Sequence, residues 1–169
     1  ELTHTRRVRY EGYKRADGLW DIEAHLTDVK NHDFTLKTGV RRAGLPVHDM
    51  TVRVTIDRKF NVVDAVAVSD AVPYPGGCEA AAPEYRKLVG LNLLKKFRHG
   101  LQERLGGVLG CTHITEMLAA LPTAAIQTFA GPGDEIVVFE PFYDSYLPSA
   151  VMAEATLRPI TLHPRDWSF

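Results

Sequence analysis

The stretch Met50–Ser69, MTVRVTIDRKFNVVDAVAVS, decides the fold. Apolar and polar residues alternate on both sides of the short segment RKF. Alternation with a period of two is typical of strands that bury one face, so the stretch predicts a β-hairpin over residues 50–69. In that hairpin Val52, Val54 and Ile56 are expected to face the core.

A second hairpin is predicted over residues 5–29. TRRVRYEGY and LWDIEAHLT both alternate, and KRADG between them is rich in turn-forming residues. In the second strand one face is apolar, with members Trp20, Ile22, Ala24 and Leu26.

The opposite face of that strand carries Asp21, Glu23 and His25. Two carboxylates and an imidazole on one face can do acid–base work if their environments separate their pKa values. Alternatively, a turn at Ala16 places Glu23 opposite Arg9, and a solvated face with cross-strand ion pairs accounts for the pattern.

Helices are expected after Ser69. The loop DAVPYPGGC is followed by apolar residues at helical spacing from Leu91 to Leu105, and a second helix is predicted from Cys111, to be stopped or kinked at Pro122. Strands before helices predict an α+β domain in which C-terminal helices cover one face of an antiparallel sheet. Residues 131–169 follow a different, β–α–β-like order.

Composition excludes several classes of function. The chain has 169 residues, 45% of them hydrophobic and 24% charged, with a formal net charge of −1. A near-neutral chain does not attract nucleic acid, and the basic segment KKFRHG fits a solvated helix face. No apolar run is long enough for a membrane span, and the chain does not open with an apolar signal segment. A cytoplasmic protein is expected, without nucleic-acid or membrane partners; the partner remains unknown and a homo-oligomer remains open.

Four segments resemble a known bacterial family of unknown function. HTRRVRYEGYKRADGLWDIEAHLTDVK, GLPVHDMTVRVTID, VVDAVAVSDAVPYPGGC and GGVLGCTHITEMLAALPTAAIQTFAG resemble, in this order, the domain-of-unknown-function family 2889. The resemblance spans residues 3–130, so a first domain is expected over 1–130. It implies no activity. In architecture the segment also loosely resembles the U-type iron–sulfur scaffold proteins, although Glu79 follows Cys78 where that family often has aspartate.

Residues 131–169 resemble something else. PGDEIVVFEPFYDSYLPSAVMAEATLRPITLHPRDWSF is similar to an internal stretch of fold-type I pyridoxal-phosphate-dependent aminotransferases of the kynurenine or methionine kind. The stretch holds no counterpart of that family's Schiff-base lysine or pyridine-pairing aspartate. Because the cofactor needs both groups together, neither bound pyridoxal phosphate nor transamination is expected.

Cys78, Cys111 and His113 form the first candidate site, with Glu116 one turn further on. Zinc and iron accept thiolate, imidazole and carboxylate ligands, and a helix start favours the thiolate form of a cysteine. In a second interpretation Cys111 is the thiolate nucleophile of a small-metabolite enzyme, with His48 or His113 as base. In a third the domain is a non-catalytic binding or assembly module whose cysteines only pack in the core.

His48 and Asp49 form a second candidate, in GLPVHDM before the best strand. A histidine–aspartate pair in a loop can supply a further metal ligand or a general base oriented by carboxylate. Alternatively, Asp49 is a turn residue and His48 is solvated.

Overall fold

A computed structural model describes residues 1–76, 79–142, 144 and 146–163. The chain forms two compact units, Glu1–Pro122 and Thr123–Phe169. Each unit is described here by itself. The sequence-based domain boundary near residue 130 stays a prediction.

The first unit is built on a four-stranded antiparallel sheet. The order in the sheet is β1-β2-β5-β6, and its strands are β1 (His4–Lys14), β2 (Trp20–Lys30), β5 (Pro46–Ile56) and β6 (Val62–Ala71). The connection between β2 and β5 carries a small ribbon of β3 (Phe34–Leu36) and β4 (Gly39–Arg41). Both predicted hairpins are therefore present, and the α+β class is confirmed.

The register of the first hairpin differs from the expected one by two residues. Arg9 lies opposite His25 rather than Glu23. The predicted turn at Ala16 is displaced because Gly18 adopts a left-handed conformation with φ of 83°, which favours glycine. The proposed Arg9–Glu23 cross-strand pair was therefore wrong.

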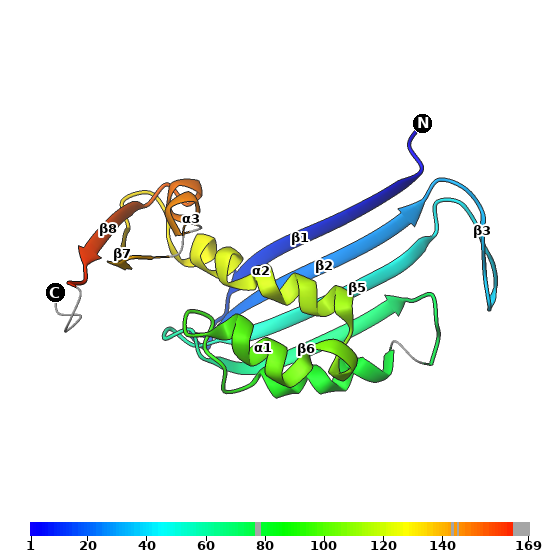
Figure 1. The fold of residues 1–169 in the computed structure, drawn as a ribbon, viewed down its shortest axis with the longest axis horizontal. Coiled ribbons are helices and arrows are strands. Elements are labelled where there is room, and N and C mark those ends of the chain that lie inside the picture. The colour runs from blue at the N-terminus through cyan, green and yellow to red at the C-terminus, as the bar shows by residue number, and fades with distance from the viewer. Residues whose placement is uncertain (77–78, 143, 145, 164–169) are drawn as a thin grey trace. The chain divides into compact units, whose positions relative to one another are not determined.

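The helical elements of the first unit follow the sheet in sequence and cover one of its faces (Figure 1). They are the 3-10 helices η1 (Glu79–Leu88) and η2 (Gly107–Leu109), the α-helix α1 (Phe97–Leu105) and the part of α2 (Thr112–Phe129) up to Pro122, where the unit ends. The core lies between the two layers, where Leu26, Met50 and Leu118 are fully or almost fully buried. The Tyr10 hydroxyl joins the layers by donating to the Met117 carbonyl at 2.9 Å.

Two helix boundaries differ from the predicted ones. Leu91 precedes α1, because its carbonyl accepts a hydrogen bond from Val62 N and holds the segment against β6. Lys96 then takes a left-handed conformation, with φ of 53°, directly before the helix. At the other end, α2 passes through Pro122 and continues to Phe129. Of the two predicted effects of Pro122, a stop or a kink, the stop was therefore wrong.

The second unit has the predicted β–α–β order. Strands β7 (Glu135–Glu140) and β8 (Thr156–Thr161) pair in parallel, and α3 (Tyr146–Met152) lies between them in sequence. Within the described residues, no helix has the length and apolar character that crossing a membrane requires.

Tyr85 is the polar group that fixes the start of α2. Its side chain is completely buried, and its hydroxyl donates to the Cys111 carbonyl at 2.9 Å and accepts from the Cys111 amide at 2.8 Å. The same oxygen lies 3.1 Å from the Thr115 hydroxyl. One phenol in η1 therefore holds the backbone of Cys111 from both sides.

Tyr85→Phe should lower the free energy of unfolding by about 1–3 kcal/mol, because the Cys111 amide loses its acceptor. The Cys111 carbonyl keeps its bond from the Thr115 amide. Urea denaturation followed by circular dichroism measures the loss. Tyr13→Phe is the matched control, since that hydroxyl bonds only at the surface, to Glu11. Equal stabilities of the two variants would contradict the assignment.

Candidate functional site

Asp28 is a carboxylate on the buried face of the sheet. Along β2 the side chains of Ile22, Ala24, Leu26 and Asp28 alternate into the core. Only 4% of the Asp28 side chain is exposed. The register between β2 and β5 shifts directly after Asp28, and such irregularities are common beside functional sites.

Four nitrogen atoms surround the Asp28 carboxylate. Arg6 binds it with two parallel bonds of 2.8 Å, from Nε to Oδ1 and from Nη2 to Oδ2. His4 Nε2 lies 3.1 Å from Oδ1, and His48 Nδ1 lies 3.0 Å from Oδ2. Each carboxylate oxygen therefore has two nitrogen neighbours, which is the usual capacity of its lone pairs.

The charge states at this cluster follow from its geometry. Burial alone would raise the pKa of Asp28, but the hydrogen bonds and charge of Arg6, helped by His48, hold that pKa below its ordinary value. For His48, burial in the first place and the nearby His113 in the second lower the pKa, against the attraction of Asp28. Asp28 is thus ionised and His48 neutral at neutral pH.

The tautomer of His48 follows as well. An ionised carboxylate only accepts hydrogen bonds, so Nδ1 of His48 carries the hydrogen that Asp28 receives. In a neutral imidazole the other nitrogen, Nε2, then has a free lone pair. Through Nε2, His48 can therefore bind a metal or accept a proton.

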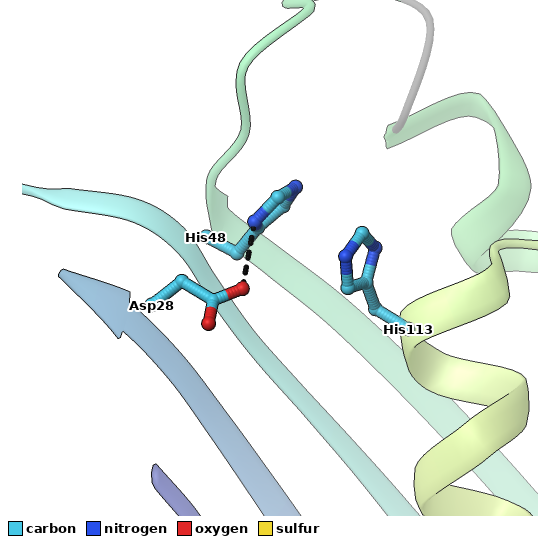
Figure 2. Close-up of side chains that lie close together, drawn as sticks. All are labelled: Asp28, His48 and His113. Atoms are coloured by element: carbon cyan, nitrogen blue, oxygen red, sulfur yellow. Dashed lines mark hydrogen bonds and ion pairs between the residues drawn. The ribbon is translucent and has the colours of Figure 1, made fainter. Parts of the chain in front are cut away.

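His113 brings a second imidazole to the same place from α2. The ring centroids of His48 and His113 are 4.0 Å apart and the rings are tilted by 36°. One potential ligand atom from each of Asp28, His48 and His113 lies within 4.8 Å of the others. Figure 2 shows the rings of His48 and His113 side by side, with the Asp28 carboxylate bonded to His48.

Cys111 lies beside His113 at the start of α2. Its Sγ is 3.9 Å from His113 Nδ1, a long contact for a sulfur hydrogen bond. Both residues line an open cleft of about 720 Å³ between η1 and the segment before α2. The thiol is therefore next to the imidazole pair and open to a small molecule.

The remaining candidate residues are Cys78, Glu116 and Asp49. Cys78 is outside the described residues. The side chain of Glu116 is 60% exposed and has an ion-pair contact of 3.7 Å with Arg6. Asp49 does not orient His48, because the two neighbours lie within β5 and point to opposite faces of the sheet. The prediction of a loop His48–Asp49 pair was wrong for this reason.

The acidic face of β2 lies on the opposite side of the sheet. There His25 Nε2 is 2.7 Å from Asp49 Oδ1, and the Thr55 hydroxyl donates to Asp21 at 2.6 Å. Glu23 lies opposite Glu11 in β1 and Arg53 in β5. Asp21 and His25 thus bond to different residues of β5, Thr55 and Asp49.

Sequence reasoning did not assign roles to Asp28, Arg6 or His4. The sequence did hold a signal for Asp28, because it occupies the next position on the strand face that carries Ile22, Ala24 and Leu26. A carboxylate on a core-facing position needs cationic or hydrogen-bonding partners. Arg6 could be found only with the correct hairpin register, which places it directly opposite Asp28.

These charge states predict that acid destabilises the fold. Both pKa values are lowered in the folded chain, so the unfolded chain binds more protons as the pH falls, and the free energy of unfolding falls with it. The loss from His48 begins near its ordinary pKa of 6.5, and the loss from Asp28 begins near 3.8. Both losses continue down to the respective folded pKa.

Urea denaturation in EDTA at about pH 7 and about pH 5 measures the His48 contribution. The variant His48→Gln should lose less stability over this interval than the unmodified chain. His99→Gln is the control, because that side chain is 71% exposed on α1. An unchanged pH slope in His48→Gln would contradict the assignment.

The fold and the cluster were compared with known proteins. No curated protein and no solved structure matches the chain. A family profile described as "Protein of unknown function (DUF2889)" matches residues 4–127, which include the whole sheet and each residue of the cluster. The match covers well over half of the chain, and the chain therefore belongs to this family of unknown function.

Proposed function

We propose that the domain binds a divalent transition metal, zinc or iron, at the paired imidazoles of His48 and His113. The observation that carries the proposal is that one potential ligand atom from each of Asp28, His48 and His113 lies within 4.8 Å of the others, with His48 neutral and its Nε2 lone pair free. Imidazole nitrogens are ligands that zinc and iron accept. The Cys111 thiolate is the proposed third protein ligand.

In this proposal Asp28 orients the site and does not bind the metal itself. Its two oxygens already have four nitrogen neighbours, so a metal on the carboxylate would have to displace one of them. A metal-bound histidine commonly donates its other N–H to a carboxylate, which fixes the ring and its tautomer. The Asp28–His48 bond has this form before any metal binds.

The chain offers a matched comparison for the site. His25 and Asp49 form a second imidazole–carboxylate pair, at 2.7 Å, on the opposite face of the same strands. Neither residue belongs to the group of potential ligands found among the described residues. Metal binding that needs two imidazoles should therefore respond to His48 and His113 and not to His25.

Metal analysis of the purified chain, followed by calorimetric titration with Zn²⁺, tests the proposal. We expect one metal per chain, lost in His48→Ala and in His113→Ala and retained in His25→Ala. Asp28→Asn should weaken binding by roughly 10–100-fold, the usual effect of removing the outer partner of a metal-bound histidine. Cys111→Ala should also weaken Zn²⁺ binding. The affinity of Cys78→Ala shows whether Cys78, which lies outside the described residues, is a further ligand.

A chain that takes up no metal would contradict the proposal. Equal affinity in the His48→Ala, His113→Ala and His25→Ala variants would contradict it as well, because the metal would then bind elsewhere. Circular dichroism of each variant separates loss of a ligand from loss of the fold.

A second candidate function is an enzyme with Cys111 as thiolate nucleophile and His113 as base. The 3.9 Å contact between Sγ and Nδ1 and the position of both residues on the cleft favour it. In the metal-free chain this candidate requires His113→Ala to slow alkylation of Cys111. If Cys111 is alkylated slowly and at the same rate in His113→Ala and in the unmodified protein, and no metal binds, a non-catalytic binding or assembly domain is the remaining interpretation.

For residues 131–169 we propose an origin as an internal piece of an aminotransferase-like sequence joined to the first domain. The parallel β7–β8 pair with α3 between its strands is consistent with a fragment of an α/β protein. Because this segment carries no cofactor-anchoring lysine, neither bound pyridoxal phosphate nor transamination is part of the proposal.

A further inference from the structure

The cleft beside Cys111 and His113 has apolar walls. On one side it is lined by Tyr74, Ala80 and Ala81, and on the other by Val108 and Leu109. Its volume of about 720 Å³ lies within the range of pockets that hold small organic ligands. The two groups that offer chemistry to an occupant, the thiol and the imidazole, lie on the same wall at the start of α2.

The large apolar side chains around this cleft are unusually exposed. Tyr74 is 57% exposed, Leu109 49% and Val108 fully exposed. A single exposed apolar residue is ordinary, but three around one cleft form a patch of the kind that marks a binding site. Burial of these side chains against an apolar occupant would be favourable.

The charge of the cleft points to the same kind of occupant. Glu84 is the one carboxylate among its described lining residues, and it is ion-paired with Lys87 on the same helix. The walls therefore offer no unpaired carboxylate to a cationic ligand. What they offer is apolar surface next to a thiol and an imidazole.

We infer that this cleft takes a small organic molecule with an apolar aryl or alkyl body, whose polar end reaches Cys111 and His113. The inference of an apolar body rests only on the apolar residues that line the cleft. The polar end rests on the proposed function, because a group that coordinates the metal would occupy the position left open beside the histidines.

Alkylation of Cys111 tests the apolar body without any metal. Chloroacetamide and N-benzylchloroacetamide carry the same electrophilic carbon, from which the thiolate displaces chloride to form a C–S bond while the thiol proton passes to solvent. Rates are measured in EDTA, assigned to Cys111 rather than Cys78 by peptide mass spectrometry, and divided by the rates with N-acetylcysteine. The benzyl reagent should react about tenfold faster with Cys111, because its ring leaves water for the apolar walls.

Two variants place this preference in the cleft. Tyr74→Ser on one side and Val108→Ser with Leu109→Ser on the other should each reduce the benzyl preference towards one. These side chains are exposed, so their replacement leaves the core unchanged. Val40→Ser is the matched control, because Val40 is 60% exposed in β4 and does not line the cleft.

Three results would overturn the inference. Equal normalised rates for the two reagents would show that no apolar body is recognised. A preference that persists in both cleft variants would place recognition elsewhere, and a Cys111 that reacts only after unfolding would show that the cleft does not reach the thiol. Failure of the proposed metal site appears separately, as absence of bound metal with the alkylation preference intact.

Discussion

A buried, ionised carboxylate needs positive charge and hydrogen-bond donors within contact distance. In the first unit Asp28 is such a carboxylate. Its neighbours come from the two strands that flank β2, with Arg6 and His4 on β1 and His48 on β5. Losing the charge-paired partner of a buried carboxylate costs far more than an exposed pair contributes. The register of β1, β2 and β5 at this end of the sheet is therefore coupled to one charge.

The same compensation sets the chemistry of His48. The carboxylate fixes Nδ1 as the donor, while burial and His113 keep the ring neutral. The pair formed by His25 and Asp49 has a similar internal distance but lies on the other face, with both side chains about one third exposed. What distinguishes the inner pair is burial and the second imidazole supplied by α2.

Much of the fold could be predicted because alternation and helical spacing report on burial. Val52, Val54 and Ile56 occupy the core as expected, and the helices follow the sheet in sequence. The hairpin register could not be predicted, since it depends on the turn conformation at Gly18. Leu91 has helical spacing but lies outside α1, because its backbone pairs with Val62 instead.

The candidate site was predictable only in part. His48, His113 and Cys111 belong to residue types with known chemistry and were named from sequence, and the fold brings them to one place. Asp28 and Arg6 were missed because a salt bridge between strands is a property of register, and the composition of either strand does not reveal it. Asp49 was assigned to His48 because adjacent residues were assumed to share a loop, whereas strand geometry sends them to opposite faces.

The position of Arg6 and His4 near the beginning of the edge strand β1 has a consequence for motion. Three of the four nitrogen atoms around Asp28 come from these two residues, and strand ends open locally at far lower free energy than the whole sheet. The two residues before β1 are held by Asn31, whose amide donates to the Thr3 carbonyl and whose side chain donates to the Leu2 carbonyl. Local opening of this strand end would take three nitrogen atoms away from Asp28 while the remaining sheet stays paired, so the compensation of the buried charge depends on the part of the strand that opens at the lowest free energy.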